Sequence, residues 1–276
     1  MGFTIATNVS SLNAMRNLTL NQTNQAKSVE RLSSGLRINR AADDAAGLSI
    51  SEGLKNQISG LTQAGRNAQD GISLVQTAEG ALTEVHNILN RMRDLAVQAS
   101  NDTNNDASRT AIGSEITELT AELGRIRDTT NFNGIQLLDN TAGATPGTLK
   151  IQVGADSGET IDVSLANVAK TIEDMGTLEV DSQENAALAI TSLDTAISAT
   201  SAQRADLGAQ QNRLESTART IAVSVENLSA ANSRIRDTDM ATEMGNFTKS
   251  QILSNAATAM LAQANQMNSG VMQLLQ

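Results

Sequence analysis

The sequence has 276 residues, a formal net charge of −10 and a pI of about 4.6, and this acidity argues against nucleic acid as a main partner. It contains no Cys, Trp or Tyr, which excludes disulfides, thiol catalysis and thiolate metal sites. Ala, Leu, Ile, Val and Met must therefore supply nearly all apolar contacts, and such side chains favour long, thin helical bundles.

The start of the chain predicts a narrow amphipathic helix with an excess of positive charge. Residues 1–40 carry a net charge of +4, and the rest of the chain carries −14. Apolar residues recur there at spacings of three or four, which places them on one helix face. The members of this stripe are Ile5, Val9, Leu12, Met15, Leu18, Val29, Leu32 and Leu36.

A second helix is predicted over residues 54–99, where the apolar stripe wraps slightly around the helix. The polar residues 100–106 end this helix. A third stripe follows over residues 112–126. Because the connection is short, we expect the third helix to fold back antiparallel on the second.

The middle of the chain changes to the alternation that is typical of strands. Residues 149–153 and 161–165 alternate apolar and polar side chains around a Gly-containing loop. This pattern predicts a β-hairpin near residues 148–165 that caps or flanks the helical bundle. The pair Asn133-Gly134 adds a turn signal.

Residues 190–235 carry the clearest periodic signal in the chain. A set of mainly apolar positions there alternates spacings of three and four without interruption, as in the seam of a coiled coil. Three seam positions are polar: Arg204, Gln211 and Asn232. They indicate either wet positions along the seam or residues that fix the register against a partner helix.

The last segment repeats the narrow, Ala-rich pattern of the first, and neither stripe is wide enough for an independent core. We expect the first and last helices to pair as a coiled coil, to leave apolar surface for neighbouring molecules and to be disordered in the free monomer. The residues expected to pack between subunits are Ile5, Val9, Leu12, Leu32, Leu36, Met244, Phe247, Ile252, Met260 and Met267.

The fold class predicted is therefore mainly all-α: a long antiparallel helical bundle or coiled coil of the N- and C-terminal segments, with a small β-hairpin region in the middle. Gly35, Gly47, Gly53, Gly60, Gly65 and Gly71 would each weaken an isolated helix by roughly 1 kcal/mol relative to Ala. They are tolerable where close packing of neighbours requires small residues.

The inventory of reactive groups favours a structural protein over an enzyme. His86 is the single His, so neither a zinc site nor a Ser/His/Asp triad can be assembled, and no cofactor or metal is expected. The acidic pairs Asp43-Asp44 and Asp237/Asp239 suit helix capping. The alternative is ion pairing between subunits with Arg37, Arg40, Arg234 or Arg236.

Several longer motifs carry a family resemblance. The run from Ser28 to Leu48, which contains Glu30-Arg31-Leu32-Ser33-Ser34-Gly35-Leu36-Arg37 and Ala41-Ala42-Asp43-Asp44-Ala45, resembles the N-terminal signature of bacterial flagellin. The stretches 207–215, 226–237 and 262–266 are similar to its C-terminal counterpart. The resemblance covers nearly the whole chain, in a minimal form that lacks the variable outer domains of the family.

The resemblance implies a secreted structural subunit that polymerises into the extracellular flagellar filament for motility. It implies that residues 1–42 and 236–276 form a terminal coiled-coil domain lining the filament core. Residues 43–180 and 181–235 would form the inner-core helical domain. The alternatives are a hook–filament junction protein and a secreted coiled-coil immune ligand.

The resemblance also implies partners. They are an export chaperone at the C-terminal helix, the type III export channel, the filament cap and the hook-associated proteins, with no nucleic acid and no membrane span. Arg91, Leu95 and Glu115 match family positions that are recognised by toll-like receptor five. Asn90 departs from the Gln that is common there. The other reading of this patch is an axial contact between subunits.

Overall fold

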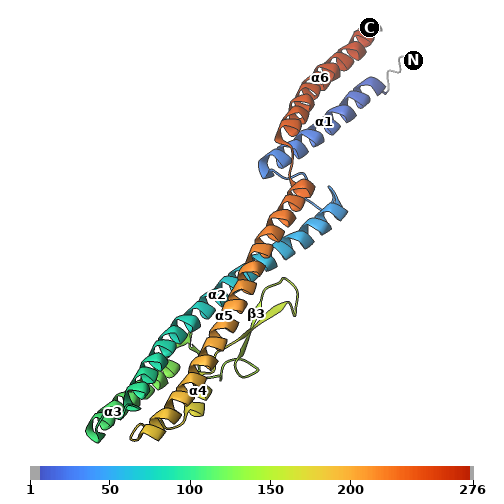
Figure 1. Ribbon diagram of the computed structural model, residues 1–276. Helices are drawn as coiled ribbons and strands as arrows, with labels where there is room; N and C mark the ends of the chain where they lie inside the picture. The colour runs from blue at the N-terminus through green and yellow to red at the C-terminus, as the bar shows by residue number, and fades with distance from the viewer. Residues whose placement is uncertain (1–6, 274–276) are drawn as a thin grey trace. The chain divides into compact units, whose positions relative to one another are not determined.

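The computed structural model describes residues 7–273, with side chains described through Gln266. As predicted, the described chain is mainly helical with a small β region in the middle (Figure 1). None of its helices combines the length and hydropathy that a membrane crossing requires. The elements are α1 (Val9–Ser34), α2 (Ala45–Ala99), α3 (Asp106–Thr129), β1 (Asn131–Phe132), β2 (Ile135–Gln136), β3 (Thr148–Gln152), β4 (Thr160–Ser164), α4 (Val168–Met175), α5 (Gln183–Arg236) and α6 (Met240–Gln273).

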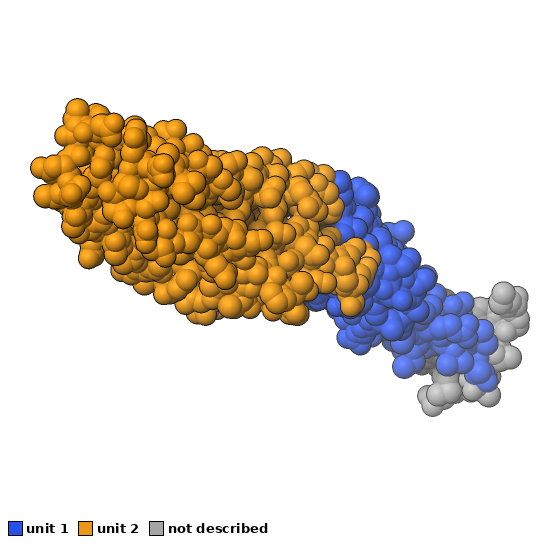
Figure 2. Space-filling view, turned by 60° about the horizontal axis from the view of Figure 1, so that its bottom comes forward, with its two compact units in different colours: residues 1–56, 227–276 blue, residues 57–226 orange. Residues whose placement is uncertain are grey.

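The chain divides into two compact units, which Figure 2 shows in different colours. Unit 1 comprises residues 1–56 and 227–276, and unit 2 comprises residues 57–226. The long helices α2 and α5 contribute residues to both units. The domain limits expected from the sequence, after residue 42 and before residue 236, remain predictions.

In unit 1, α1 packs antiparallel against α6 (Figure 1). The Asn8 side-chain amide donates to the Ala264 carbonyl at 3.1 Å, near the start of one helix and toward the end of the other. Near the opposite ends, Arg31 Nη1 lies 3.7 Å from Glu243 Oε2. Gly35 ends α1 with a φ of 72°, a left-handed conformation that a side chain would disfavour. The pairing predicted for the first and last helices is confirmed.

In unit 2, α2 and α5 run antiparallel along the predicted coiled-coil seam. Contacts pair Gly65 with Ile221 and Gly71 with Leu214, and an ion pair joins Glu79 to Arg204 farther along. Six of the eight buried residues of α5 repeat every seven positions, namely Ala186, Leu193, Thr200, Leu207, Leu214 and Ile221, and the other two are Ala189 and Ala196. The remaining seam positions in this part of the helix are half-buried, so the heptad reading is confirmed.

Helix α3 folds back on α2, as the short connection predicted. The Arg109 guanidinium donates from Nε to the Ala99 carbonyl at 3.1 Å, and Arg91 contacts Glu115 two turns away. The buried side chains that α2 and α3 contribute to one cluster along this pairing include Leu89, Met92, Leu95, Ile112, Ile116 and Leu123.

The β3–β4 hairpin lies against α2. Its register pairs Leu149 with Val163 and Ile151 with Ile161, so the predicted strands are confirmed. A Cβ added at Gly71 would lie 3.1 Å from Ile151 Cδ1, and one added at Gly60 would lie 2.9 Å from Ala155 Cβ. Gly60 and Gly71 therefore let the hairpin approach the helix closely, and this close packing accounts for them.

Two short features were not predicted. Strands β1 and β2 flank the expected Asn133-Gly134 turn, whose φ values of 50° and 80° suit a type I′ hairpin. The eight-residue helix α4 follows the main hairpin and begins with Asn167, whose side chain accepts from the Lys170 N–H at 2.8 Å. Segments this short contain too few residues for periodicity to reveal them.

Candidate assembly surfaces

The faces that α1 and α6 turn toward each other consist mostly of small or polar residues, with a few larger apolar ones among them. In α1 the covered positions follow the alternation of three and four residues, and α6 mirrors it. Such a seam buries little apolar surface, so its contribution to stability is modest. The covered residues at these spacings are Ser11, Ala14, Leu18, Asn21, Gln25, Ser28 and Leu32 in α1, and Glu243, Phe247, Ser250, Ser254, Ala257, Leu261 and Ala264 in α6.

Most of the larger apolar side chains of these two helices point outward instead. Complete burial of such a side chain is worth about 1.5–3 kcal/mol, so leaving many of them in water favours association. The outward set comprises Val9, Leu12, Met15, Leu20 and Val29 in α1, and Met240, Met244, Ile252, Leu253 and Met260 in α6, each between 43% and 66% exposed.

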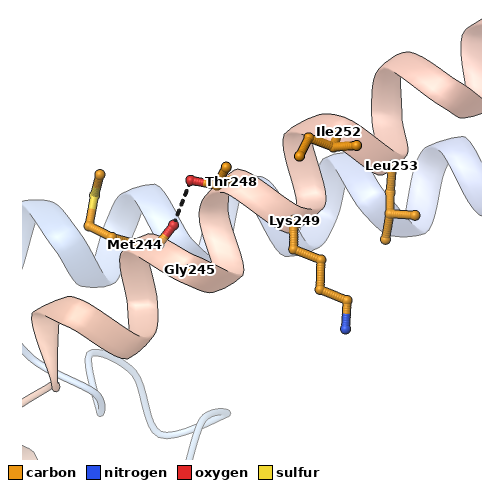
Figure 3. A pocket seen from close by; sticks show the side chains of 6 residues that line it. All are labelled: Met244, Gly245, Thr248, Lys249, Ile252 and Leu253. Carbon is orange, nitrogen blue, oxygen red and sulfur yellow. Dashed lines mark hydrogen bonds between the residues drawn. The ribbon is translucent and has the colours of Figure 1, made fainter.

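A shallow, mainly apolar groove runs along the outer side of α6 (Figure 3). Met244, Thr248 and Ile252 follow one another at intervals of one helical turn, and the Thr248 hydroxyl donates to the Met244 carbonyl at 2.9 Å. That bond satisfies the hydroxyl within its own helix, which leaves its methyl group to the groove. Lys249 and Leu253 complete the lining.

Gly245 lies in this groove, and the described part of the chain gives no packing reason for it. A Cβ added there would meet no atom outside its own helical turns within 4 Å. A glycine inside a helix costs roughly 1 kcal/mol relative to Ala. The small residue therefore suits a close approach from outside the chain. Sequence reasoning overlooked Gly245, although a Gly inside a helical pattern is a usable signal.

The residues predicted to pack between subunits divide into three groups. Val9, Leu12, Met244, Ile252 and Met260 are exposed on the outer faces. Leu32, Leu36 and Phe247 are half-buried within unit 1 and offer less free surface. Ile5 lies outside the described residues, as does the side chain of Met267. The sequence stripe omitted Leu20 and Leu253, which fall off its strict helical spacing.

The two connections between long helices pair with each other in unit 1. The Arg37 N–H donates to the Arg236 carbonyl at 2.6 Å, and the Thr238 N–H donates to the Gly35 carbonyl at 3.0 Å. Arg37 also donates from Nη2 to the Ile235 carbonyl at 2.6 Å. These bonds hold the end of α1 beside the end of α5.

Two of the four acidic residues, Asp44 and Asp239, cap helix starts, while Asp43 closes the turn before α2 and Asp237 accepts from the Ser233 hydroxyl at 2.6 Å. The Asp43 carboxylate accepts from the Arg40 and Asn39 N–H groups, and these bonds lower the pKa of Asp43. Asp44 accepts from the Gly47 N–H at 2.9 Å, at the start of α2. Asp239 accepts from the Thr242 N–H and hydroxyl and from the Ala241 N–H, which lowers its pKa.

The polar residues of the α5 seam have different surroundings. Arg204 Nη2 lies 3.6 Å from Glu79 Oε1 on α2, a contact that suits a role in register. Gln211 donates to Glu215 within its own helix at 2.9 Å. His86 is half-buried on α2, and the residues that the structure describes contain no cluster of His, Asp or Glu able to hold a metal ion.

The predicted receptor patch is brought together in part. Arg91 on α2 donates two hydrogen bonds to one oxygen of Glu115 on α3, from Nη2 at 2.7 Å and from Nε at 3.1 Å to Oε1. Their side chains are 56% and 45% exposed. Leu95 is 2% exposed and belongs to the core between the helices. Arg91 and Glu115 therefore present a surface, and Leu95 supports it from below.

Comparisons with known proteins agree with this architecture. A model of the bacterial flagellin N-terminal helical region matches residues 5–143, and one of the C-terminal helical region matches residues 190–275. The chain is 52% identical to a flagellin of Halalkalibacterium halodurans, over 97% of this chain and 98% of that one. It is 43% identical to the flagellar filament 31.3 kDa core protein of Treponema maltophilum, over 98% of each chain. The crystal structure of Bacillus cereus flagellin is similar with a TM-score of 0.51 and 38% identity, over 60% of this chain and 94% of that one.

Proposed function

Because this chain belongs to the bacterial flagellin family, and is thus a structural subunit of the extracellular flagellar filament, we propose that copies pack through the outer faces of α1 and α6. The observation that supports this is the direction of the apolar side chains. Leu12, Met15, Ile252 and Met260 face outward, whereas the seam between the two helices is mostly small or polar.

This distribution suits a polymer better than a stable monomer. Each outward side chain is already partly covered, so its further burial is worth roughly 1 kcal/mol. Such contacts repeat at every lattice neighbour, and many weak contacts together give a stiff tube whose subunits remain soluble before assembly. Gly245 allows a neighbouring backbone or side chain to come close to α6.

Elongation of filament seeds tests this proposal. We expect purified protein to extend sheared filament fragments, as seen by electron microscopy. The double substitution Leu12→Gln and Ile252→Gln should slow elongation by roughly tenfold or more, because two exposed apolar contacts become polar. The matched control is Gln22→Asn with Gln251→Asn, which changes exposed polar residues on the same two helices.

The results separate the proposal from its alternatives. Ordinary elongation by the Leu12 and Ile252 variant would overturn the role of the outer faces. A protein that never elongates seeds and stays monomeric would instead favour the secreted immune ligand. Family membership already favours the filament subunit over the hook–filament junction protein.

The same outer face of α6 would need a cover before assembly. Exposed Met244, Ile252, Leu253 and Met260 would otherwise associate prematurely. An export chaperone that shields this face fits that need, and the filament cap and the hook-associated proteins would then receive the released helix. The Ile252→Gln variant should bind such a chaperone more weakly, with roughly tenfold lower affinity in calorimetry.

Recognition by toll-like receptor five would use the exposed Arg91–Glu115 pair. Arg91→Ala would remove an exposed charged group, and Leu95→Ala would disturb the helix beneath it. The two substitutions differ in their expected effect on folding, because Arg91→Ala should leave the thermal stability of unit 2 nearly unchanged. If a folded Arg91→Ala monomer signals through the receptor as strongly as the parent protein, the receptor reading of this patch is wrong. The axial contact between subunits is then the reading that remains.

A further inference from the structure

The methionines divide sharply in their exposure. The chain has nine, and the structure describes the side chains of six of them. Met15, Met240, Met244 and Met260 are 60%, 48%, 51% and 66% exposed, and all four belong to unit 1. The two described methionines of unit 2, Met92 and Met175, are 0% and 5% exposed.

The exposed methionines lie among the outward apolar side chains. Met15 follows Leu12 by three residues on α1, and Met260 follows Leu253 by seven on α6, so each pair shares a helix face. Met244 lines the groove that also contains Ile252 (Figure 3). A chemical change at these sulfur atoms would therefore alter the surface proposed for assembly.

The composition directs two-electron oxidation toward these side chains. With no Cys in the chain, the thioether is the most readily oxidised side chain that remains for a peroxide near neutral pH. Trp and Tyr are absent as well. Exposure then decides which thioethers react, because the oxidant must reach the sulfur atom.

We propose that Met15, Met240, Met244 and Met260 are oxidation sites through which a peroxide stops free subunits from joining the filament. This inference rests on the proposed function of the outer faces. The sulfur lone pair attacks one peroxide oxygen, the S–O bond forms and the O–O bond breaks. Sulfur loses two electrons, the remaining oxygen leaves as water, and the product is methionine sulfoxide.

The product no longer suits an apolar contact. A sulfoxide is polar and chiral, and its oxygen accepts hydrogen bonds that a buried apolar interface does not supply. Oxidised subunits would lose affinity for the growing end, whereas subunits already in the lattice would be shielded. Oxidation would therefore act only on subunits that have not yet joined a filament. A sulfoxide-reducing enzyme with a thiol reductant would reverse the oxidation.

The site assignment is tested on the free subunit. Purified monomer is treated with hydrogen peroxide at pH 7, and sulfoxide formation at each methionine is followed by peptide mass spectrometry. We expect the four exposed sites to react roughly tenfold or more faster than Met92 and Met175. Comparable rates at all six would overturn the assignment. Assembled filaments should react more slowly at the same four sites.

The functional consequence is tested by seed elongation with peroxide-treated subunits. We expect treatment to slow elongation roughly tenfold, and methionine sulfoxide reductase to restore it. The key variant carries Met15→Leu, Met240→Leu, Met244→Leu and Met260→Leu, which conserve side-chain volume. Its peroxide sensitivity is read as the ratio of treated to untreated elongation for the same variant, and we expect that ratio to stay near one. The control carries Met92→Leu with Met175→Leu and should remain sensitive.

The outcomes keep this proposal separate from the function on which it rests. If untreated protein fails to extend seeds, the assembly role fails, while the oxidation map still stands or falls on the mass spectra. If untreated protein extends seeds but the four-Leu variant stays as sensitive as the parent, the oxidation proposal is wrong. Sensitivity would then belong to methionines outside this set.

Discussion

Two glycines of the long helices, Gly71 and Gly245, have different surroundings. Gly71 makes room for Ile151 of the hairpin within the same chain, at 3.1 Å from an added Cβ. Gly245 faces open space on the outside of α6. The sequence shows both as the same helix-weakening residue, and only the packing around them tells which is needed inside the subunit.

Replacing Gly245 with Ala separates folding from assembly. Ala should stabilise α6 by roughly 1 kcal/mol, because no atom of the chain is displaced and helix propensity rises. Seed elongation should nevertheless slow, since the added methyl group occupies space left for a neighbour. Thermal unfolding by circular dichroism and elongation by microscopy measure the two effects, and faster elongation would refute this role for Gly245.

Asp239 gives the start of α6 a defined dependence on pH. Its folded pKa is lowered, so the carboxylate form is favoured in the folded chain. The stabilisation is complete above the ordinary Asp value of 3.8 and is lost as the pH falls through the lower folded value. Asp239→Asn should keep an N-cap without this titration.

Helix content measured by circular dichroism from pH 6 to pH 2 tests this role. Because other carboxylates titrate in the same range, the informative quantity is the difference between the native protein and Asp239→Asn. The native protein should lose more helix on acidification. An identical loss of helix in both proteins would show that protonation of Asp239 does not affect the stability of α6.

The apolar seam of helix α5 is buried by other residues of the same chain. Leu214 is 0% exposed at a heptad position and lies against Gly71 of α2. Leu214→Ala should destabilise unit 2 by about 2–5 kcal/mol, as expected for a buried Leu that leaves a cavity. The control on the same helix is Leu188→Ala, at a side chain that is 67% exposed. Urea denaturation should show a large change for the first and almost none for the second.

The helices and the main hairpin could be predicted because their periodicity is long and regular. The heptads of α5 and the alternating strands β3 and β4 are examples. The inner face of α1 could not, since it consists of residues such as Ser11, Asn21 and Ser28. Periodicity locates an apolar stripe, but it does not tell whether the stripe meets its own chain or another copy.

The candidate site was predictable to a similar extent. Val9, Leu12, Met244, Ile252 and Met260 were selected from the sequence and are exposed on the outer faces. Leu95 was grouped with Arg91 and Glu115, yet the structure buries it. A residue carried over from a family motif gives a position in the sequence, and burial decides whether the side chain itself is available.

Across the subunit, the two ends and the middle differ in how they are stabilised. Unit 2 has an extensive apolar core, whereas the α1–α6 pair of unit 1 is held mostly by small and polar contacts. We expect amide hydrogens of α1 and α6 to exchange rapidly in the free subunit and slowly in the filament. Helix content should rise on polymerisation, and equal protection before and after assembly would contradict this expectation.

The most direct test uses the absence of Cys from the chain. Ile252→Cys places a single thiol on the outer face of α6, and Ala189→Cys places one in the buried core of unit 2 as a control. Alkylation at position 252 should be fast in the free subunit and roughly a hundredfold slower in the filament, while position 189 should react slowly in both. Equal alkylation of position 252 before and after assembly would show that neighbouring copies do not cover this face.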